Sequence, residues 1–156
     1  MFDDQIPRPD NSRILKYLSQ AYGSLRLGDL CSDNGKHVLH VASVARNFIG
    51  IREDFAPGVH QLRFSRKEDF YYVLLILSSD LFFSYWRTVG DGFHVTKTNI
   101  HEFPVHASLK IFLNEKLSTT KKIWAARATY RKSKLNSGRH THSYDFSDRA
   151  PSLLLC

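Results

Sequence analysis

The most regular pattern of apolar positions lies in the middle of the chain, between Ser65 and Arg87. The segment begins with Ser-Arg-Lys-Glu, the composition of a capping box, in which the Ser hydroxyl accepts a hydrogen bond from the amide three residues later and the Glu side chain reaches back. Apolar residues then recur near helical spacing and cover most of the circumference, which predicts one long buried helix. These positions are Phe70, Val73, Leu74, Leu77, Leu81, Phe82, Tyr85 and Trp86.

Three segments before this helix have the composition of β-strands. Residues 36–45 are rich in Val and Leu and follow an Asn-Gly turn signal at residues 33–35. Residues 47–51 are a second candidate strand, and residues 60–64 alternate after a turn at residues 56–58. Strands joined by such short connections favour an antiparallel sheet.

A second long helix is predicted for residues 108–135, because an apolar face there precedes Asn136-Ser137-Gly138, a composition typical of helix C-termini. Between the two helices, residues 89–92 form a tight turn with two glycines and residues 93–96 are extended. Thr98 or Asn99 then caps a short helical turn that Pro104 closes. The pattern predicts an α+β fold in which a small antiparallel sheet packs with two long helices.

At 156 residues the chain has the length of one domain. Residues 1–24 are predicted to be a lead-in with a short helix over residues 14–21, and residues 25–138 the domain itself. Residues 139–156 are predicted to be a tail, in which we expect Ser152 to begin an element that the chain does not complete.

The charge balance adds a class of partner to this picture. The chain has 22 Lys and Arg against 15 Asp and Glu, a net charge of +7. Such a field attracts polyanions, of which nucleic acid is the commonest and an anionic membrane the other, although charge alone is equally compatible with a basic protein that has no such partner. The polar N-terminus, the two cysteines and the lack of a long apolar segment predict a cytoplasmic protein without a membrane partner.

The sequence lacks the motifs of the common catalytic and metal sites. It has no Pro-Pro pair, and a predicted helix precedes its single Gly-x-Gly, at residues 90–92, where a cofactor-binding fold needs a strand. No Asp or Glu is followed two positions later by Lys, the spacing that is common in metal-dependent nucleases of the restriction type. The histidine pairs His101/His106 and His140/His142 lack accompanying cysteines. We therefore expect no catalytic residue, no metal and no cofactor in this chain.

A polar segment follows the buried helix, and this segment together with the end of the helix carries a family resemblance. Residues 77–87, residues 90–97 and Phe103-Pro104 together resemble the specificity (target recognition) domain of TaqI-like and type IIG restriction–modification adenine-N6 DNA methyltransferases. In that family a helix with the pattern Leu-Asn-Ser-x-Leu-Phe-x-x-x-Trp-Arg precedes a Gly- or Asp-containing turn and a short helix ending in Phe-Pro. The present chain has Ser78 where the family has Asn, a position that is structural.

The resemblance implies a module that binds double-stranded DNA and supplies sequence specificity to a methyltransferase domain or subunit absent from this chain, which would hold the S-adenosylmethionine. Phosphate contacts then fix the register and base contacts carry the sequence information. Asp91 serves either the bases or the turn. The expected base-reading residues are Arg87, Asp91, His94, Thr96, Lys97 and Asn99. The expected phosphate contacts are Arg46, Arg63, Arg66, Lys121, Lys122, Arg127, Arg131 and Lys132.

Three alternatives remain open at this point. The Lys and Arg residues in the C-terminal half of the second predicted helix could serve only to stabilise its macrodipole, or be solvated charges. The chain could be a small metal-dependent nuclease built around His94, Asn99 and His101. It could also be a protein-interaction subunit whose basic face docks an acidic partner.

Overall fold

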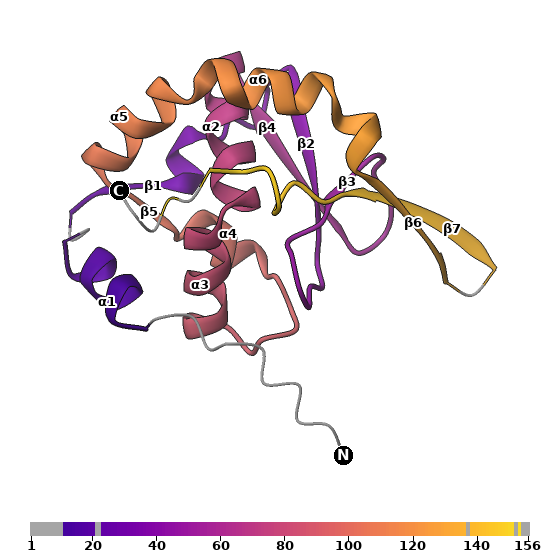
Figure 1. The fold of residues 1–156 in the computed structure, drawn as a ribbon, viewed down its shortest axis with the longest axis horizontal. Coiled ribbons are helices and arrows are strands. Elements are labelled where there is room, and N and C mark those ends of the chain that lie inside the picture. The colour runs from indigo at the N-terminus through magenta and orange to yellow at the C-terminus, as the bar shows by residue number, and fades with distance from the viewer. Residues whose placement is uncertain (1–10, 21–22, 137, 152, 154–156) are drawn as a thin grey trace.

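The computed structural model describes residues 11–20, 23–136, 138–151 and 153, and it has a mixed α+β fold (Figure 1). Across these ranges, five strands form one antiparallel sheet in the order β4-β2-β3-β7-β6, and β1 pairs with β5 in a second, two-stranded sheet. The predicted fold class is confirmed. The strands are β1 Leu25–Arg26, β2 His37–Ala42, β3 Ile51–Arg52, β4 Val59–Phe64, β5 Pro104–Val105, β6 Arg131–Asn136 and β7 Arg139–Tyr144.

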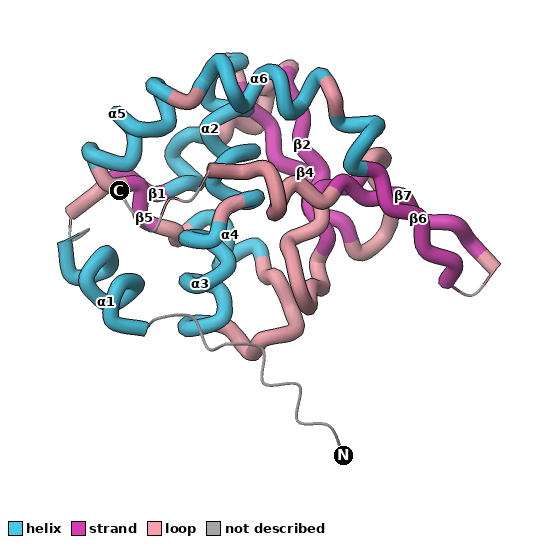
Figure 2. Tube along the Cα trace, viewed as in Figure 1, coloured by secondary structure: helices cyan, strands magenta, loops and turns pink. Residues whose placement is uncertain are grey.

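The helices gather on one side of the sheet, with α2 packed on β2 and β4 (Figure 2). None of the helices in the described ranges has the length and apolar character that crossing a bilayer requires. The helices are α1 Asn11–Gln20, η1 Leu27–Leu30, α2 Lys67–Ser78, α3 Asp80–Val89, α4 Lys97–His101, α5 Ala107–Glu115, α6 Leu117–Ala125 and η2 Arg127–Tyr130.

The strand predictions before α2 are largely confirmed. Residues 36–45 contain β2, residues 60–64 lie within β4, and the helix expected over residues 14–21 is α1 as far as residue 20. The candidate strand at residues 47–51 is wrong for most of its length, because only Ile51 belongs to a strand. The backbone of residues 43–50 turns instead, and the Ala42 amide donates to the Gly50 carbonyl at 2.9 Å.

The single helix predicted from Ser65 to Arg87 is wrong, because Ser79 divides it into α2 and α3. The Ser79 hydroxyl donates to the Ile76 carbonyl at 2.6 Å and accepts from the Phe82 amide at 3.2 Å, so it ends one helix and caps the next. The apolar pattern continues across this break because both helices bury their apolar residues in the same core. The capping box at Ser65 is also absent: the N-cap is Arg66, without a side-chain hydrogen bond.

The second long helix, predicted for residues 108–135, is wrong as well. Lys116 interrupts it between α5 and α6, and after η2 the chain enters β6, which pairs with β7 along its whole length. Asn136-Ser137-Gly138, expected to end a helix, lies where the two strands of this hairpin are joined. Gly138 has a φ of +79°, and Ser137 lies outside the described residues. The segment expected to be a tail therefore begins with a strand of the main sheet.

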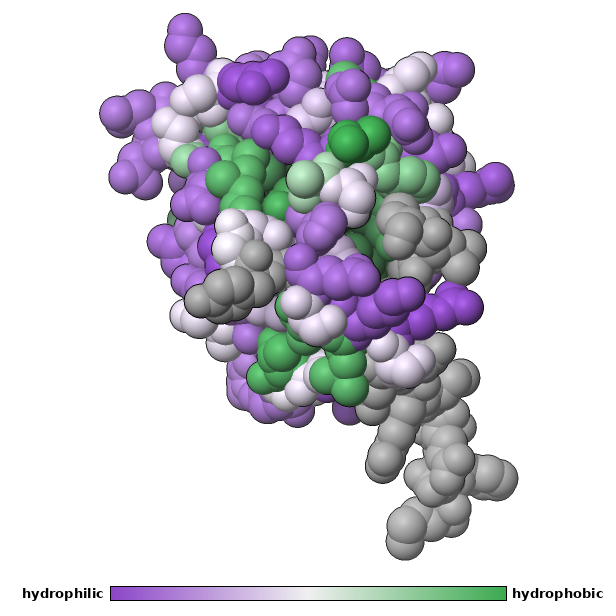
Figure 3. Space-filling view, turned by 90° about the vertical axis from the view of Figure 1, so that its left-hand side faces the viewer, coloured by the Kyte–Doolittle hydropathy of each residue, from purple (hydrophilic) through white to green (hydrophobic). Residues whose placement is uncertain are grey.

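The core is aromatic and extends into the C-terminal segment. Trp86, Phe82 and Phe103 are each 0% exposed, and Tyr144, Phe146 and Leu153 are also buried. The remaining residues of the element predicted to begin at Ser152 lie outside the described ranges. On the side of the molecule opposite the β6–β7 hairpin, apolar side chains gather over α1 and α5 among hydrophilic ones (Figure 3). The exposed apolar residues of these helices are Leu15 and Ile111.

Candidate nucleic-acid interface

The segment between α3 and α4, residues 90–96, is a loop with fixed ends that we call the glycine loop. The Trp86 indole Nε1 donates to the His94 carbonyl at 2.7 Å, and the Gly90 amide donates to the Trp86 carbonyl at 2.8 Å. A Cβ atom at Gly90 would lie 2.8 Å from that same carbonyl oxygen, so the close approach requires glycine. The loop is thereby tied to the end of α3.

The other side of the glycine loop is bonded to the segment that follows β2. The Val95 amide donates to the Ser43 carbonyl at 2.8 Å, and the Ala45 amide donates to the Phe93 carbonyl at 2.9 Å. The Nε2 atom of His60, on β4, lies 2.6 Å from the Val95 carbonyl oxygen. The glycine loop is therefore a fixed extension of the sheet, and its polar side chains are displayed from a rigid frame.

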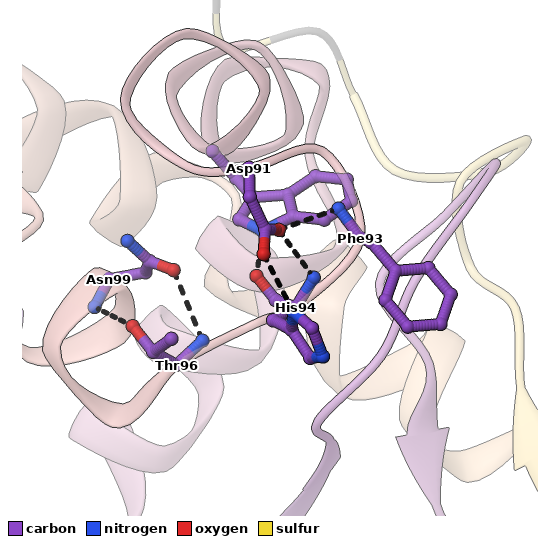
Figure 4. A network of polar contacts seen from close by, with 6 residues as sticks. Asp91, Phe93, His94, Thr96 and Asn99 are labelled. Atoms are coloured by element: carbon purple, nitrogen blue, oxygen red, sulfur yellow. Dashed lines mark hydrogen bonds and ion pairs between the residues drawn. The ribbon is translucent and has the colours of Figure 1, made fainter.

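Asp91 and His94 form one polar pair within this loop (Figure 4). Asp91 Oδ1 accepts from the backbone amides of Phe93 and His94 at 2.8 and 2.7 Å, and Oδ2 lies 2.6 Å from His94 Nδ1. The hydrogen bond from the His94 side chain, followed by those from the two amides, lowers the pKa of Asp91 to about 2. Asp91 thus stabilises the turn, while its side chain and that of His94 remain 55% and 59% exposed.

Thr96 and Asn99 form a second pair, which caps α4 (Figure 4). The Asn99 amide donates to Thr96 Oγ1 at 3.0 Å, and the Thr96 amide donates to Asn99 Oδ1 at 3.1 Å. The predicted cap at Thr98 or Asn99 is therefore wrong: Thr96 is the N-cap, and Asn99 completes a capping box. The cap leaves the side-chain nitrogen Nδ2 of Asn99 without a hydrogen-bond partner among the described residues.

The remaining two expected base-reading residues take no part in the hydrogen bonds that hold the glycine loop and cap α4. Lys97 is exposed at the first position of α4, and Arg87 is half-buried in the last turn of α3. Neither forms a hydrogen bond or ion pair within the part of the chain that the structure describes. The six residues lie on one short stretch of the surface, but four of them also hold the stretch in shape.

Several of the expected phosphate contacts are occupied by protein partners. Arg131 pairs with Glu53 at 2.9 Å and Lys132 with Asp145 at 2.7 Å. The Arg127 guanidinium lies 4.6 Å from the centroid of the Trp124 ring. Arg66 lies 4.0 Å from Glu68, and Arg63 donates to the Gly35 carbonyl and to Gln61. Lys121 lies over the Tyr71 ring. Arg46 and Lys122 are exposed and have no ion pair in the described ranges.

The cations expected toward the end of the second helix belong to a larger basic segment, which includes a β-hairpin that the sequence did not predict. The segment from Lys116 to Tyr144 contains eight of the 22 Lys and Arg and none of the 15 Asp and Glu, so its formal charge of +8 exceeds the +7 of the whole chain. It folds into α6, η2 and the β6–β7 pair, which we call the basic hairpin (residues 131–144). Lys134 and Arg139, on the outer part of this hairpin, were not among the expected contacts. Both are exposed.

An aromatic cluster anchors the base of the basic hairpin. The Trp124 ring lies 5.9 Å from that of Tyr144, and Tyr130 lies 5.5 Å from Phe146 (centroid distances). Burial raises the pKa of Asp145, but hydrogen bonds from Lys132 and Ser147 outweigh it and hold this pKa below its usual range. The same hydrogen bond raises the pKa of Lys132. An ion pair that includes a largely buried carboxylate therefore adds to the aromatic contacts.

The glycine loop and the turn of the basic hairpin lie at opposite ends of the sheet's strands. The loop is bonded to Ser43 and Ala45, just after β2 ends. β7 runs in the same direction as β2, because each is antiparallel to β3, so the turn that precedes β7 lies at the level where β2 begins. The expected base-reading residues therefore lie apart from the cations of the basic hairpin, whereas Arg46, next to Ala45, lies beside the glycine loop.

Residues proposed for catalysis are not brought together. His94 is bonded to Asp91, Asn99 to Thr96, and the His101 ring packs against Gly28, so none of the three is hydrogen-bonded to another. Among the described residues, no three His, Cys, Asp or Glu side chains are grouped as metal ligands would be. Comparison with models of known protein families, with curated proteins and with solved structures gave no match.

Proposed function

We propose that this chain is a DNA-recognition module that binds duplex DNA and supplies specificity to an adenine-N6 methyltransferase domain or subunit, which holds the S-adenosylmethionine and performs the chemistry. Such a module would act in the cytoplasm. The observation that carries the proposal is the segment 116–144, which carries a charge of +8 over Lys116, α6, η2 and the basic hairpin without an acidic residue.

The physical basis is the release of counterions from DNA. Each phosphate that a Lys or Arg neutralises frees condensed cations, and this term supplies most of the affinity of a basic surface for a duplex. Lys122 lies exposed on α6, and Lys134 and Arg139 lie exposed on the hairpin. These side chains have no ion pair with the protein in the described ranges, so their charges remain available to phosphates.

The glycine loop supplies the second part of the proposal. Groups that read bases must be held in a defined position, and hydrogen bonds to Trp86, Ser43 and Ala45 hold this loop at both ends. The groups available to DNA are the Nε2 atom of His94, the side-chain nitrogen of Asn99, and the charged ends of Lys97 and Arg87. Lys and Arg bind guanine, and the Asn99 side-chain nitrogen can donate one hydrogen bond to a base acceptor.

The test is a titration of a fluorescent 20-base-pair duplex by the purified chain, followed by anisotropy at several salt concentrations. The logarithm of the affinity is expected to fall linearly with the logarithm of the salt concentration, with a slope of about 0.9 per phosphate contacted. Lys122→Ala should weaken binding and reduce the slope, whereas Lys16→Ala, on α1, should do neither. A chain that binds no duplex even at about 50 mM salt contradicts the proposal.

The same titration separates this proposal from the two alternatives. A subunit whose basic face docks an acidic protein should show no affinity for DNA in isolation. A nuclease should cleave the duplex when a divalent metal is added, and the cleavage should disappear with His94→Ala. The proposed module binds the duplex and leaves it intact.

A further inference from the structure

We infer that the basic hairpin is inserted into the major groove of duplex DNA, with the face that carries Lys134 and Arg139 toward the groove. This inference rests on the proposed DNA-binding function and names the element and the groove through which it acts. It starts from the alternation of side chains along β6 and β7, which assigns the residues of the hairpin to two different faces.

The strand register separates a cationic face from a neutral one. Lys134 pairs with Thr141 and Asn136 with Arg139, so the side chains of Lys134 and Arg139 lie on one face at diagonal positions. Lys132 lies on this face as well, but its charge is matched by Asp145. Two neighbouring cations are therefore displayed without a carboxylate partner in the described ranges, and an anion brought to this face would bind both.

On the opposite face, the polar side chains nearer the sheet are paired within the protein. The Ser133 hydroxyl lies 2.7 Å from His142 Nδ1, and Arg131 pairs with Glu53. Leu135, also on this face, is 61% exposed and apolar. This face carries no unpaired Lys or Arg among the described residues. The hairpin therefore has a single cationic face, and we expect that face to meet the DNA.

The outer part of the hairpin extends beyond the sheet (Figure 1). β3 pairs with β7 at Tyr144 and Ser143, and the Glu53 amide makes one further hydrogen bond to the His142 carbonyl. Three residues of β7, Arg139 to Thr141, then have β6 as their one strand partner in the described ranges. At about 3.4 Å a residue, this outer part projects about 10 Å.

The dimensions match the major groove of B-form DNA. That groove is about 12 Å wide and about 8.5 Å deep and admits a two-stranded β-ribbon, whereas the minor groove is about half as wide. A ribbon that projects about 10 Å therefore reaches the base edges. The aromatic contacts of Trp124 and Tyr130 and the Lys132–Asp145 pair hold its base in place, so insertion needs little ordering of the chain.

Charges on an edge strand also have a second use, because they prevent β6 from pairing with the edge of another molecule. Charge reversal distinguishes the two uses. A glutamate at position 134 protects the edge as well as lysine does, but it repels phosphate. The double variant Lys134→Glu/Arg139→Glu is therefore the test, with Lys16→Glu/Lys110→Glu as its control. The control residues are exposed on α1 and α5, away from the hairpin (Figure 1).

The first readout is the affinity for a 20-base-pair duplex, measured on both double variants and the unchanged chain after thermal unfolding shows that each is folded. The hairpin variant should lose roughly tenfold or more, and the control should lose about threefold or less. If the reversed charges prevent folding, Lys134→Gln/Arg139→Gln takes their place. Equal losses in the hairpin and control variants overturn the inference while the proposed function stands. Absence of binding by the unchanged chain overturns both.

The second readout identifies the groove. Methyl green, which occupies the major groove, should compete with the unchanged chain, whereas netropsin, which occupies the minor groove, should not. A double-stranded RNA of the same sequence should bind more weakly, because its major groove is too narrow for side chains to read. Displacement by netropsin alone, or preference for the RNA, overturns the assignment to the major groove.

Discussion

The indole Nε1 of Trp86 donates a hydrogen bond to the backbone carbonyl of His94 at 2.7 Å, and this contact joins the core to the glycine loop. Trp86 is 0% exposed, whereas the His94 side chain is 59% exposed. One residue that packs against the buried helices thus fixes the backbone of another that faces solvent. The position of the proposed base-reading side chains therefore depends on core packing.

Trp86→Phe should lower the free energy of unfolding by about 1 to 3 kcal/mol, since it removes this hydrogen bond and leaves a small cavity. Tyr85→Phe is the matched control, because the Tyr85 hydroxyl has no hydrogen-bond partner among the described residues. Urea denaturation compares the two. Equal stability of the two variants would show that the indole contact does not hold the loop.

The low pKa of Asp91 predicts how the stability of the glycine loop varies with pH. This pKa falls from 3.8 to about 2 because of the hydrogen bond from His94 and those from the two backbone amides. A carboxylate whose pKa is lower in the folded state stabilises it above the unfolded pKa and loses that effect as the pH falls through the folded value. The stabilisation should be complete above about pH 5 and lost between about pH 4 and pH 2.

Asp91→Asn tests this dependence, because the amide oxygen can still accept from the backbone while the charge is gone. The unchanged chain should be the more stable at pH 7, and the difference should disappear as the pH approaches 2. A difference that stays constant over this range would mean that the Asp91 charge contributes nothing.

Two adjacent serines at the break between α2 and α3 predict opposite outcomes. Ser79→Ala removes both the cap of α3 and the bond to Ile76, and should cost about 1 to 2 kcal/mol of unfolding free energy. Ser78→Ala removes a buried hydroxyl that has no partner in the described part of the chain, and should leave stability unchanged or raise it. Thermal unfolding of both variants distinguishes these outcomes, and the reverse order would mean that Ser79 is not the cap.

The parts of the fold that were predictable from the sequence are those governed by local residue pattern. The Val and Leu content of residues 36–45 correctly indicates β2, and the apolar spacing from Phe70 to Trp86 correctly marks the buried helices. The same apolar pattern conceals the break at Ser79, because both helices bury their residues in one core. A hydroxyl that replaces one turn of backbone hydrogen bonds does not disturb that spacing.

The basic hairpin was missed because the residues of its first strand favour a helix. Lys, Arg and Leu favour helices, so residues 131–136 look like the end of one. Pairing with β7, which itself pairs with Ile51 and Arg52, outweighs that preference. Within the site, the turn role left open for Asp91 is confirmed, whereas the cap at Thr96 was missed because Thr98 and Asn99 offer the same chemistry within three residues.

Lys132 and Lys134 lie two positions apart on β6. We expect the first to affect mainly the stability of the fold and the second mainly the affinity for DNA. The Lys132 ammonium lies 2.7 Å from the Asp145 carboxylate, whose side chain is 8% exposed. Lys132→Ala should leave this carboxylate without its charged partner and cost about 1 to 2 kcal/mol of unfolding free energy. Because Lys132 is held by Asp145, its loss removes no direct phosphate contact, and the affinity for DNA should fall less than with Lys134→Ala.

Lys134→Ala should do the reverse. Its side chain is exposed and has no ion pair among the described residues, so stability should change by less than about 0.5 kcal/mol. The affinity for DNA should fall, and the slope of its logarithm against that of the salt concentration should decrease by about one contact. Chemical denaturation and anisotropy on the two variants measure both quantities. If Lys132→Ala weakened binding more than Lys134→Ala, the unpaired cation would not be the one that meets the phosphate.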